Sequence, residues 1–223
     1  TTGFIKYFIR KYKVDMSEAV NENPSYYPSF NSFFTREIKK ELRPFANSDL
    51  ISPVDGAVSQ IGLIKKDQIF QAKGKSFTIE ALLGGDKDLA NVFRNGLFAT
   101  LYLSPKDYHR IHMPCAGKLL KMIYIPGDLY SVNPLTAQNI DALFARNERV
   151  VCVFEGERGP FALVLVGATV VGSIKTSWHG IVNSPRPTSV HTWEYDGQLQ
   201  LEKGEEMGQF LLGSTVVLVY PDV

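Results

Sequence analysis

From about residue 50 onward, the chain consists of short runs of aliphatic, β-branched and aromatic residues that glycines and prolines separate. Runs of this length between turn residues are typical of β-strands. A roughly helical spacing of apolar residues predicts one helix in this part, over residues 79–94. The expected fold class is therefore α+β with a mainly antiparallel β-sheet core. We expect strands over residues 56–64, 97–103, 118–124, 149–154, 161–171 and 215–220.

A short pattern, Pro-x-x-Gly-x-aliphatic, occurs twice, at residues 53–58 and 114–119. Each copy is a turn that leads into an expected strand. The repeat suggests two related β halves, although two short turns can also coincide by chance.

The first 45 residues differ in pattern and predict a helical segment ahead of a β-rich domain over residues 46–223. A second helix is expected over residues 32–42. Within residues 1–13, apolar side chains at helical spacing are accompanied by basic ones, with no acid before Asp15. A basic amphipathic helix either lies in a membrane interface or docks on the protein's own core, and the segment alone favours neither. The apolar stripe is Phe4, Ile5, Phe8, Ile9 and Tyr12, and the basic residues are Lys6, Arg10, Lys11 and Lys13.

Composition narrows the class of protein. Lys and Arg number 24 against 23 Asp and Glu, so the net charge of +1 provides no field that would attract nucleic acid. The two cysteines, Cys115 and Cys152, are too few for a disulfide framework, and a reducing compartment is expected. The longest apolar stretch is about 12 residues, shorter than the roughly 20 that a spanning helix needs. No signal peptide is expected.

The densest group of chemically active residues lies in residues 104–114, which contain His109 and His112. Imidazole titrates near neutral pH, so histidine is a common general acid or base. The pair has three interpretations: metal ligands, structural side chains bonded to loop backbone, or proton carriers. No third ligand with recognisable spacing supports a metal, and we expect none.

Two further positions have both a structural and a chemical interpretation. Asp55 precedes Gly56, where an aspartate most often stabilises a turn, yet it is also suited to orient a histidine. Ser214 follows Gly213 at the start of an expected strand. That pair is typical of a bulge or turn, and it lacks the second glycine of a nucleophile elbow.

Taken together, these pieces resemble phosphatidylserine decarboxylases of the bacterial and mitochondrial type. The resemblance runs in order from about Phe30 to the end of the chain, and no position that the family needs for chemistry departs from it. It is carried by Pro53-Val54-Asp55-Gly56, by residues 101–114 with Tyr108-His109-Arg110-Ile111-His112-Met113-Pro114, by residues 124–129, by Asn147-Glu148-Arg149 and by Leu212-Gly213-Ser214-Thr215.

The resemblance implies a proenzyme that cuts itself between Gly213 and Ser214. Ser214 would become a pyruvoyl group, the built-in cofactor, at the start of a small chain of residues 214–223, and the large chain would be 1–213. In processing, His112 would take the proton of Ser214 while Asp55 holds the histidine ring. His109 would then return a proton to the substrate carbon after CO2 has left. Ser131 and Val132 would line the headgroup site.

The implied substrate is phosphatidylserine and the products are phosphatidylethanolamine and CO2. Because acyl chains stay in the bilayer, the resemblance favours the membrane interpretation of residues 1–13, as peripheral contact without a span. We expect the bacterial cytoplasmic membrane, with the mitochondrial inner membrane as the alternative. The cleaved small chain would stay bound as an interior strand, and a homodimer is compatible with this interpretation.

Three other functions remain as alternatives on the residues alone. A serine hydrolase would use Asp55, His112 and Ser214 without cutting its own chain. A lipid-binding β module without enzymatic activity would be indifferent to the loss of Ser214. A zinc enzyme would use His109 and His112 and would contain stoichiometric metal.

Overall fold

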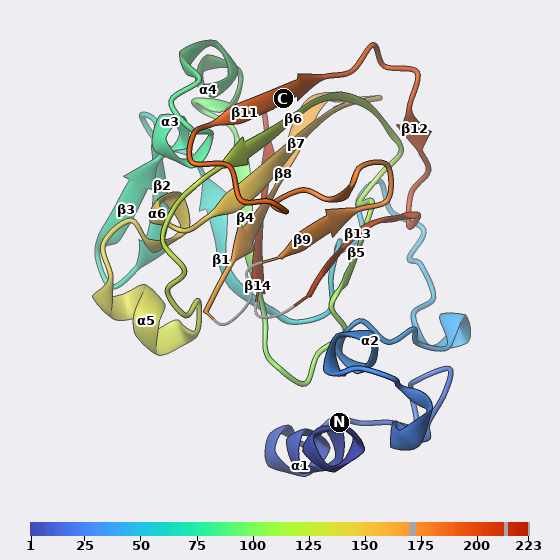
Figure 1. Ribbon diagram of the computed structural model, residues 1–223. Coiled ribbons are helices and arrows are strands. Elements are labelled where there is room, and N and C mark those ends of the chain that lie inside the picture. The colour runs from blue at the N-terminus through green and yellow to red at the C-terminus, as the bar shows by residue number, and fades with distance from the viewer. Residues whose placement is uncertain (170–172, 212–213, 223) are drawn as a thin grey trace.

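The computed structural model describes residues 1–169, 173–211 and 214–222, and within them two antiparallel sheets pack face to face (Figure 1). The helical elements are α1 (Thr2–Tyr12), η1 (Pro24–Tyr26), α2 (Phe30–Phe34), η2 (Lys40–Leu42), α3 (Ile79–Leu82), α4 (Lys87–Phe93), α5 (Pro134–Asn139) and α6 (Leu143–Arg146). The strands are β1 (Ala57–Leu63), β2 (Gln68–Ala72), β3 (Lys75–Thr78), β4 (Leu97–Leu103), β5 (Arg110–His112), β6 (Gly117–Ile125), β7 (Arg149–Gly156), β8 (Gly159–Gly167), β9 (Ile174–Thr176), β10 (Gly180–Ile181), β11 (His191–Glu194), β12 (Gln200–Leu201), β13 (Glu206–Phe210) and β14 (Ser214–Tyr220).

The larger sheet has eight strands in the order β1-β4-β14-β8-β7-β6-β11, with β12 also paired to β6. The smaller sheet has the order β10-β9-β13-β5, and β2 and β3 form a separate hairpin. The two Pro-x-x-Gly turns lead into β1 and β6, which lie in the same large sheet. The repeat therefore does not divide the chain into two separate sheets.

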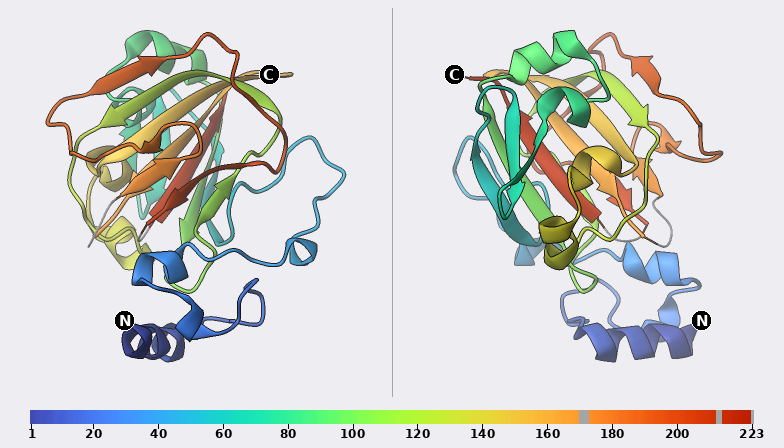
Figure 2. Two further views of the ribbon diagram at one scale, coloured as in Figure 1. Left: turned by 45° about the vertical axis from the view of Figure 1, so that its right-hand side comes forward. Right: turned by 90° about the vertical axis from the view of Figure 1, so that its left-hand side faces the viewer.

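Alternate residues of β7 pack on opposite faces of the large sheet. Val150 and Cys152 belong to a cluster with residues of β5, β9 and β13, so the small sheet covers this face. Val151 and Val153 belong to a cluster with residues of α3, α4, α6 and the β2-β3 hairpin, which cover the other face (Figure 2). Burial on both faces explains why β7, β8 and β14 have continuous apolar sequences instead of alternating ones.

The strand β14 lies inside the large sheet. It pairs with β4 along Ser214–Tyr220 and with β8 along Ser214–Val219, and its residues Val216, Val217 and Val219 are fully buried. This confirms the expectation of an interior strand. Hydrogen bonds on both edges and burial on both faces hold these residues independently of the covalent link to residue 213.

The N-terminal helices stand at one end of the sheets and have a small apolar cluster of their own (Figure 2). Ile5 and Phe8 of α1 are buried against Phe33 and Phe34 of α2. Most of the apolar stripe of α1 is therefore docked on the protein itself, whereas Phe4 remains 55% exposed. No helix of the described part of the chain is long and apolar enough to cross a membrane.

Most of the expected elements are confirmed, and two helices and one strand end are corrected. The strand expected over residues 161–171 is β8, which ends at Gly167, and residues 170 and 171 lie outside the described residues. The expected helix over residues 79–94 is two short helices, α3 and α4, because Gly84 and Gly85 between them adopt positive φ angles. The expected helix over residues 32–42 is wrong. The helix α2 ends at Phe34, and Ile38 pairs with Ala19 in an isolated β-bridge.

Gly56, in the turn that carries Asp55, adopts a φ of +143°, and a Cβ there would lie 2.3 Å from the carbonyl oxygen of Tyr102. We expect Gly56→Ala to destabilise the proenzyme by roughly 2 kcal/mol or more, because the backbone of residue 56 and the carbonyl of Tyr102 would have to move apart. Gly62→Ala in β1 is the matched control, since its Cβ would make only an ordinary contact with Phe98. The free energy of unfolding of both variants is measured by denaturant unfolding followed by circular dichroism. The Ser214→Ala substitution is included in each protein so that the chain stays uncut. Equal stability of the two variants would contradict this account of the turn.

Candidate active site

Ser214 is the first residue of β14 and lies opposite Leu103 of β4 and Gly167 of β8. Side chains alternate along a strand, so Ser214 faces the same side as Val216, toward the layer between the two sheets. It is fully buried, and its Oγ has no hydrogen-bond partner among the described residues. A buried hydroxyl without a partner is costly, and the hydroxyls of Thr215 and of Thr100 on β4 share this property. Ser214 differs from them in its place at the first position of the strand. Gly213, the expected partner in cleavage, lies outside the described residues.

His109 lies just before β5 and is fully buried. Its Nδ1 is 2.8 Å from the carbonyl oxygen of Asp107, which can only accept, so Nδ1 carries the proton and Nε2 has the lone pair. That Nε2 is buried and unpartnered within the described chain, and the ring lies 4.0 Å from the ring of Phe34, centroid to centroid. The backbone carbonyl of His109 accepts from the N–H of Phe210, four residues before Ser214.

Burial lowers the pKa of His109 to about 3, and the charge of Arg36 acts in the same direction. The ring is therefore neutral at physiological pH. Its Nε2 has an uncommitted lone pair, but the same burial opposes protonation of this nitrogen.

His112 lies on the other side of β5 from the buried Ile111 and is half-buried. Its Nδ1 is 2.8 Å from the carbonyl oxygen of Gly204, so Nε2, 3.0 Å from the hydroxyl of Tyr108, accepts a hydrogen bond from it. Both ring nitrogens are thus engaged. To take a proton from Ser214, His112 has to give up the bond from Tyr108.

Asp55 is bound by Arg43 through three contacts, of 3.0, 3.0 and 2.7 Å. Among the described residues no hydrogen bond joins Asp55 to His112 or Ser214. The backbone nevertheless brings the two regions together, because the N–H of His112 donates to the carbonyl of Pro53 at 2.8 Å. The division of roles among Asp55, His112 and His109 stays a prediction.

The loop with Ser131 and Val132 is tied to the strand that neighbours Ser214. Asn147 exchanges hydrogen bonds with the backbone of Tyr130 and donates to the carbonyl of Gly167, the residue opposite Ser214. Ser131 accepts from the side-chain amide of Asn133, and Val132 is buried in the core beside the helices. Their expected role in substrate binding stays a prediction.

Sequence reasoning assigned no role to three buried polar residues near this end of the sheets. Asn147 anchors the loop just described. Glu148 accepts from Tyr124 at 2.8 Å and pairs with Arg186 at 3.3 Å. Arg36 is 4% exposed and contacts the loop that carries His109. Asn147 and Glu148 belong to the Asn147-Glu148-Arg149 motif named above, so the sequence marked their positions. Their burial, which indicates a role in the site, is visible only in the structure.

The arrangement combines a buried hydroxyl at a fixed backbone position, a neutral imidazole with an uncommitted lone pair and a second imidazole beside a carboxylate-bearing turn. Such a set suits proton transfer at a serine in surroundings that exclude water. Among the described residues, no group of three or more His, Cys, Asp or Glu side chains is arranged to hold a metal ion.

Comparison with known proteins agrees with this geometry. The family model for phosphatidylserine decarboxylase matches residues 30–223. A phosphatidylserine decarboxylase proenzyme of Azoarcus sp. is 64% identical over 99% of this chain and 77% of its own length. The proenzymes of Herminiimonas arsenicoxydans and Chromobacterium violaceum are each 63% identical, over 99% of this chain and 76% and 80% of their own lengths. With its buried serine at the start of an interior strand and matches over nearly its whole length, this chain belongs to the phosphatidylserine decarboxylase family.

Proposed function

We propose that this chain is a phosphatidylserine decarboxylase proenzyme, which cuts itself between Gly213 and Ser214 and then converts phosphatidylserine to phosphatidylethanolamine and CO2. The observation that carries the proposal is Ser214, fully buried with an unpartnered Oγ at the first position of a central strand, in a chain of this family. A hydrolase without self-cleavage is not favoured, because the relatives are named as proenzymes.

Processing consumes the Ser214 hydroxyl. Once a base removes its proton, Oγ attacks the carbonyl carbon of Gly213, and the peptide C–N bond breaks as the C–O ester bond forms. Removal of the α-proton of residue 214 then breaks the Cβ–O bond, which frees the Gly213 carboxylate and leaves dehydroalanine. Addition of one water and loss of ammonia convert dehydroalanine to the pyruvoyl group.

We assign to His112 the role of the base that removes the Ser214 proton. Asp55 would orient the histidine ring, and Arg43 holds the carboxylate of Asp55 in place. One observation supports this choice: the backbone bond between His112 and Pro53, two residues before Asp55. The Nδ1–H of His112 is bonded to the carbonyl of Gly204, so Asp55 would have to replace that carbonyl to hold the ring. The Tyr108 hydroxyl that occupies Nε2 would move aside first.

A pyruvoyl ketone at residue 214 would supply the electron sink that accepts the electron pair left on the substrate carbon when CO2 departs. The buried surroundings of Ser214 fit it, because they hold residue 214 at a fixed place and exclude water. We assign to His109 the delivery of a proton to the substrate carbon. His109 is neutral here, and the anionic carboxylate of an arriving substrate would favour its protonated form.

The processed strand would stay in place. Residues 214–220 keep their hydrogen bonds to β4 and β8 when the bond to residue 213 is broken. Burial of Val216, Val217, Leu218 and Val219 adds roughly 1.5–3 kcal/mol for each side chain. Cleavage therefore changes the chemistry of residue 214 without releasing it.

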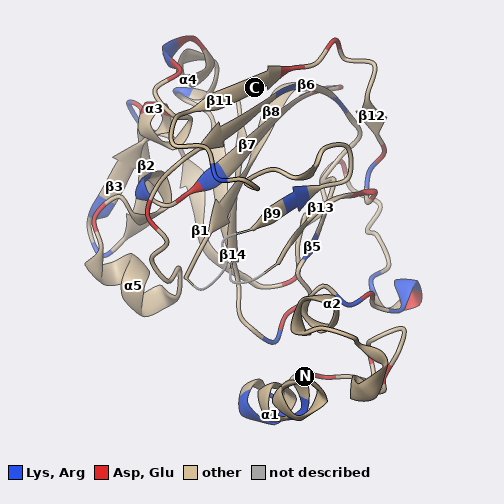
Figure 3. Ribbon diagram, in the orientation of Figure 1, with Lys and Arg blue, Asp and Glu red and all other residues tan. Residues whose placement is uncertain are grey.

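We further propose that residues 1–45 place the enzyme on the bacterial cytoplasmic membrane without a span. On α1, Phe4 and Tyr7 are each 55% exposed, and the basic residues Lys6, Arg10 and Lys11 are exposed as well. Figure 3 shows the basic positions of this helix in blue. Exposed aromatics beside cations suit the interface of an anionic bilayer, where each basic residue adds roughly 1 kcal/mol.

Ser214→Ala removes the hydroxyl that the cut requires and leaves the strand intact. We expect a folded single chain near the full mass that releases no CO2 from phosphatidylserine, whereas wild type gives two species, the smaller with a blocked amino terminus. Intact mass spectrometry under denaturing conditions measures this. A processed product from Ser214→Ala, or a permanently uncut wild type that is active, would overturn the assignment.

Substitution of each histidine separates the two proposed roles. We expect His112→Ala to remain largely unprocessed, and His109→Ala to process at least in part but to lose turnover. Cleavage is followed by mass over time and decarboxylation by CO2 release. The reverse pattern, with His109→Ala uncut and His112→Ala cut normally, would show that the roles are exchanged.

Membrane contact is tested without disturbing the cluster that Ile5 and Phe8 build. We expect Phe4→Ser combined with Tyr7→Ser, or neutralisation of Lys6, Arg10, Lys11 and Lys13, to weaken flotation with vesicles that contain anionic phospholipid. Neutralisation of Lys87 on α4, away from the N-terminal segment, is the control. Full flotation of both N-terminal variants would exclude this surface as the contact.

A further inference from the structure

Arg36 follows α2 closely and is buried, with 4% of its surface exposed. Its Nη2 donates to the carbonyl of Lys106 at 3.0 Å, and the guanidinium lies 5.5 Å from the centroid of the Phe33 ring. The remaining two nitrogens, Nε and Nη1, have no hydrogen-bond partner in the described part of the chain. Arg36 is therefore a buried cation with two unused donor positions.

The other arginine of similar burial, Arg149, has an acceptor for each of its nitrogens. Arg149 is equally buried, and its three nitrogens donate to the carbonyls of Leu82, Asn147 and Ala81. Its donors are satisfied by the fold alone. Arg36, in contrast, keeps two donors without acceptors, at a free-energy cost that the fold does not offset.

No carboxylate of the described residues compensates the charge of Arg36 by direct contact. Burial lowers the pKa of Arg36, and Tyr27, Glu18, Asp107 and Asp55 act on it only by charge interactions without a hydrogen bond. Glu18 is bound by Arg43. The carboxylate of Asp107 already accepts from the backbone and hydroxyl of Ser104, and Asp55 is bound by Arg43. An anionic group from outside the chain would supply what the fold does not.

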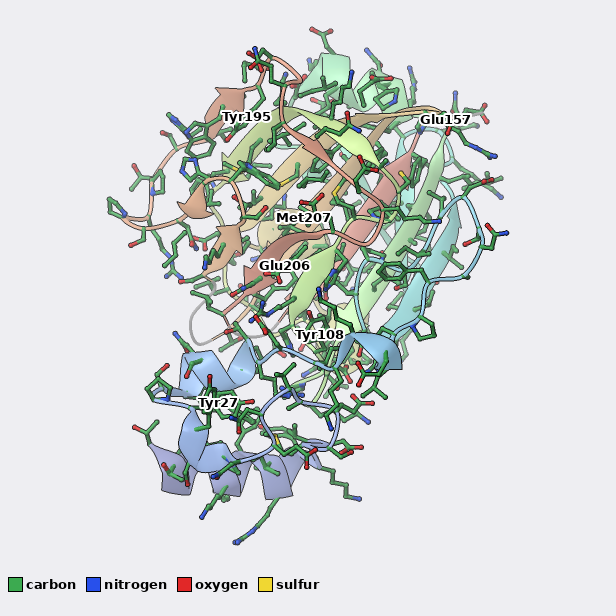
Figure 4. All side chains as sticks on the ribbon, turned by 90° about the vertical axis from the view of Figure 1, so that its right-hand side faces the viewer. Tyr27, Tyr108, Glu157, Tyr195, Glu206 and Met207 are labelled. Carbon is green, nitrogen blue, oxygen red and sulfur yellow. The ribbon has the colours of Figure 1, made fainter. Side chains whose placement is uncertain are left out.

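Arg36 lies at the junction between the N-terminal helices and the candidate site. Its neighbour Thr35 accepts from Arg110 of β5 at 2.9 Å, and Phe34 packs on the ring of His109. Lys106, which Arg36 contacts, comes three residues after Leu103, the partner of Ser214 in the sheet. Figure 4 shows Tyr108 of this same loop where the helical segment meets the strands.

We infer that Arg36 binds the phosphodiester of the substrate headgroup through its two unused donors. This inference rests on the proposed function. A headgroup that leaves the bilayer at the N-terminal helices passes α2 before its amine reaches residue 214, and only a few covalent bonds separate that amine from the phosphorus. A guanidinium presents paired N–H donors that match two phosphate oxygens. Entry of the headgroup requires α2 and the 104–109 loop to move apart.

The phosphodiester fits better than the serine carboxylate, which shares the same anionic oxygen chemistry. The carboxylate leaves as neutral CO2, so a strong bond to it would stabilise the bound substrate more than the transition state. The phosphodiester keeps its charge throughout the reaction. A bond to it strengthens binding uniformly and is expected to appear in KM, with kcat unchanged.

The test uses Arg36→Met and Arg36→Lys, with the exposed Arg94→Met as the matched control, on soluble short-chain phosphatidylserine. Processing is checked by intact mass before the kinetics. We expect Arg36→Met to raise KM by about tenfold or more with kcat little changed, and Arg36→Lys to recover part of the loss. A rise of kcat together with KM would assign Arg36 to the carboxylate instead, and a fall in kcat at constant KM would place its role in the chemical step; either result would overturn the inference. So would failure of both variants to process while Arg94→Met processes normally.

A second arm removes the charge from the substrate instead of the protein. For wild type, KM should be higher for a neutral phosphotriester analogue than for the diester, by a factor similar to that caused by Arg36→Met. For the Arg36→Met enzyme, KM should be nearly the same for the two substrates. Equal KM of wild type for the diester and the triester would overturn the inference without any variant. Wild type that processes but releases no CO2 from phosphatidylserine would instead refute the proposed function itself.

Discussion

The pairing of β14 with β4 on one side and β8 on the other is the constraint on which the rest of the structure depends. It fixes residue 214 at the end of a ladder whose two neighbours are themselves central strands. A reactive group at this position inherits the rigidity of the sheet, which a group on a loop would lack. The histidine loop, the Asp55 turn and the Asn147 anchor all surround the same end of this ladder.

The site is built largely from polar groups that the fold buries without satisfying. Ser214 Oγ, His109 Nε2 and two nitrogens of Arg36 have no partners among the described residues, in a protein whose other buried arginine is fully bonded. Each such atom costs free energy in the proenzyme. Thr100, Thr215 and Trp178 also have a buried side-chain atom without a partner, so this property is not confined to the candidate site. Ser214, His109 and Arg36 differ from them in that their unpartnered atoms can take part in proton transfer or bind an anion.

Much of the fold could be predicted from the sequence, because hydrophobic periodicity and turn residues depend on local structure. The strand at residues 97–103 and the interior strand before Tyr220 have the expected extents, give or take one residue. The helix predicted over residues 32–42 failed because a tertiary contact, the Ile38–Ala19 bridge, overrides the local pattern. The candidate reactive residues were predicted by resemblance, and they stay predictions. Arg36 was not predicted, since a lone arginine in a sequence gives no sign of its burial.

The hydrogen bonds of the two histidines also lay beyond sequence reasoning. The spacing of His109 and His112 does not indicate that Nε2 of His109 has no hydrogen-bond partner among the described residues. Nor does it indicate that both nitrogens of His112 are bonded, to Tyr108 and to Gly204. Those differences come from their positions: His109 lies in the loop before β5 and bonds the backbone of that loop, whereas His112 is the last residue of β5 and bonds the carbonyl of Gly204.

The position of β14 in the sheet has a consequence for the order of events during synthesis. This strand follows all the others in the described chain, yet its place is between two that are made much earlier. Until it arrives, β4 and β8 each present an unpaired edge toward the gap, the kind of edge that invites wrong partners. The serine acquires its buried surroundings only when that gap is filled, so the proposed scission would be restricted to molecules that have completed their architecture.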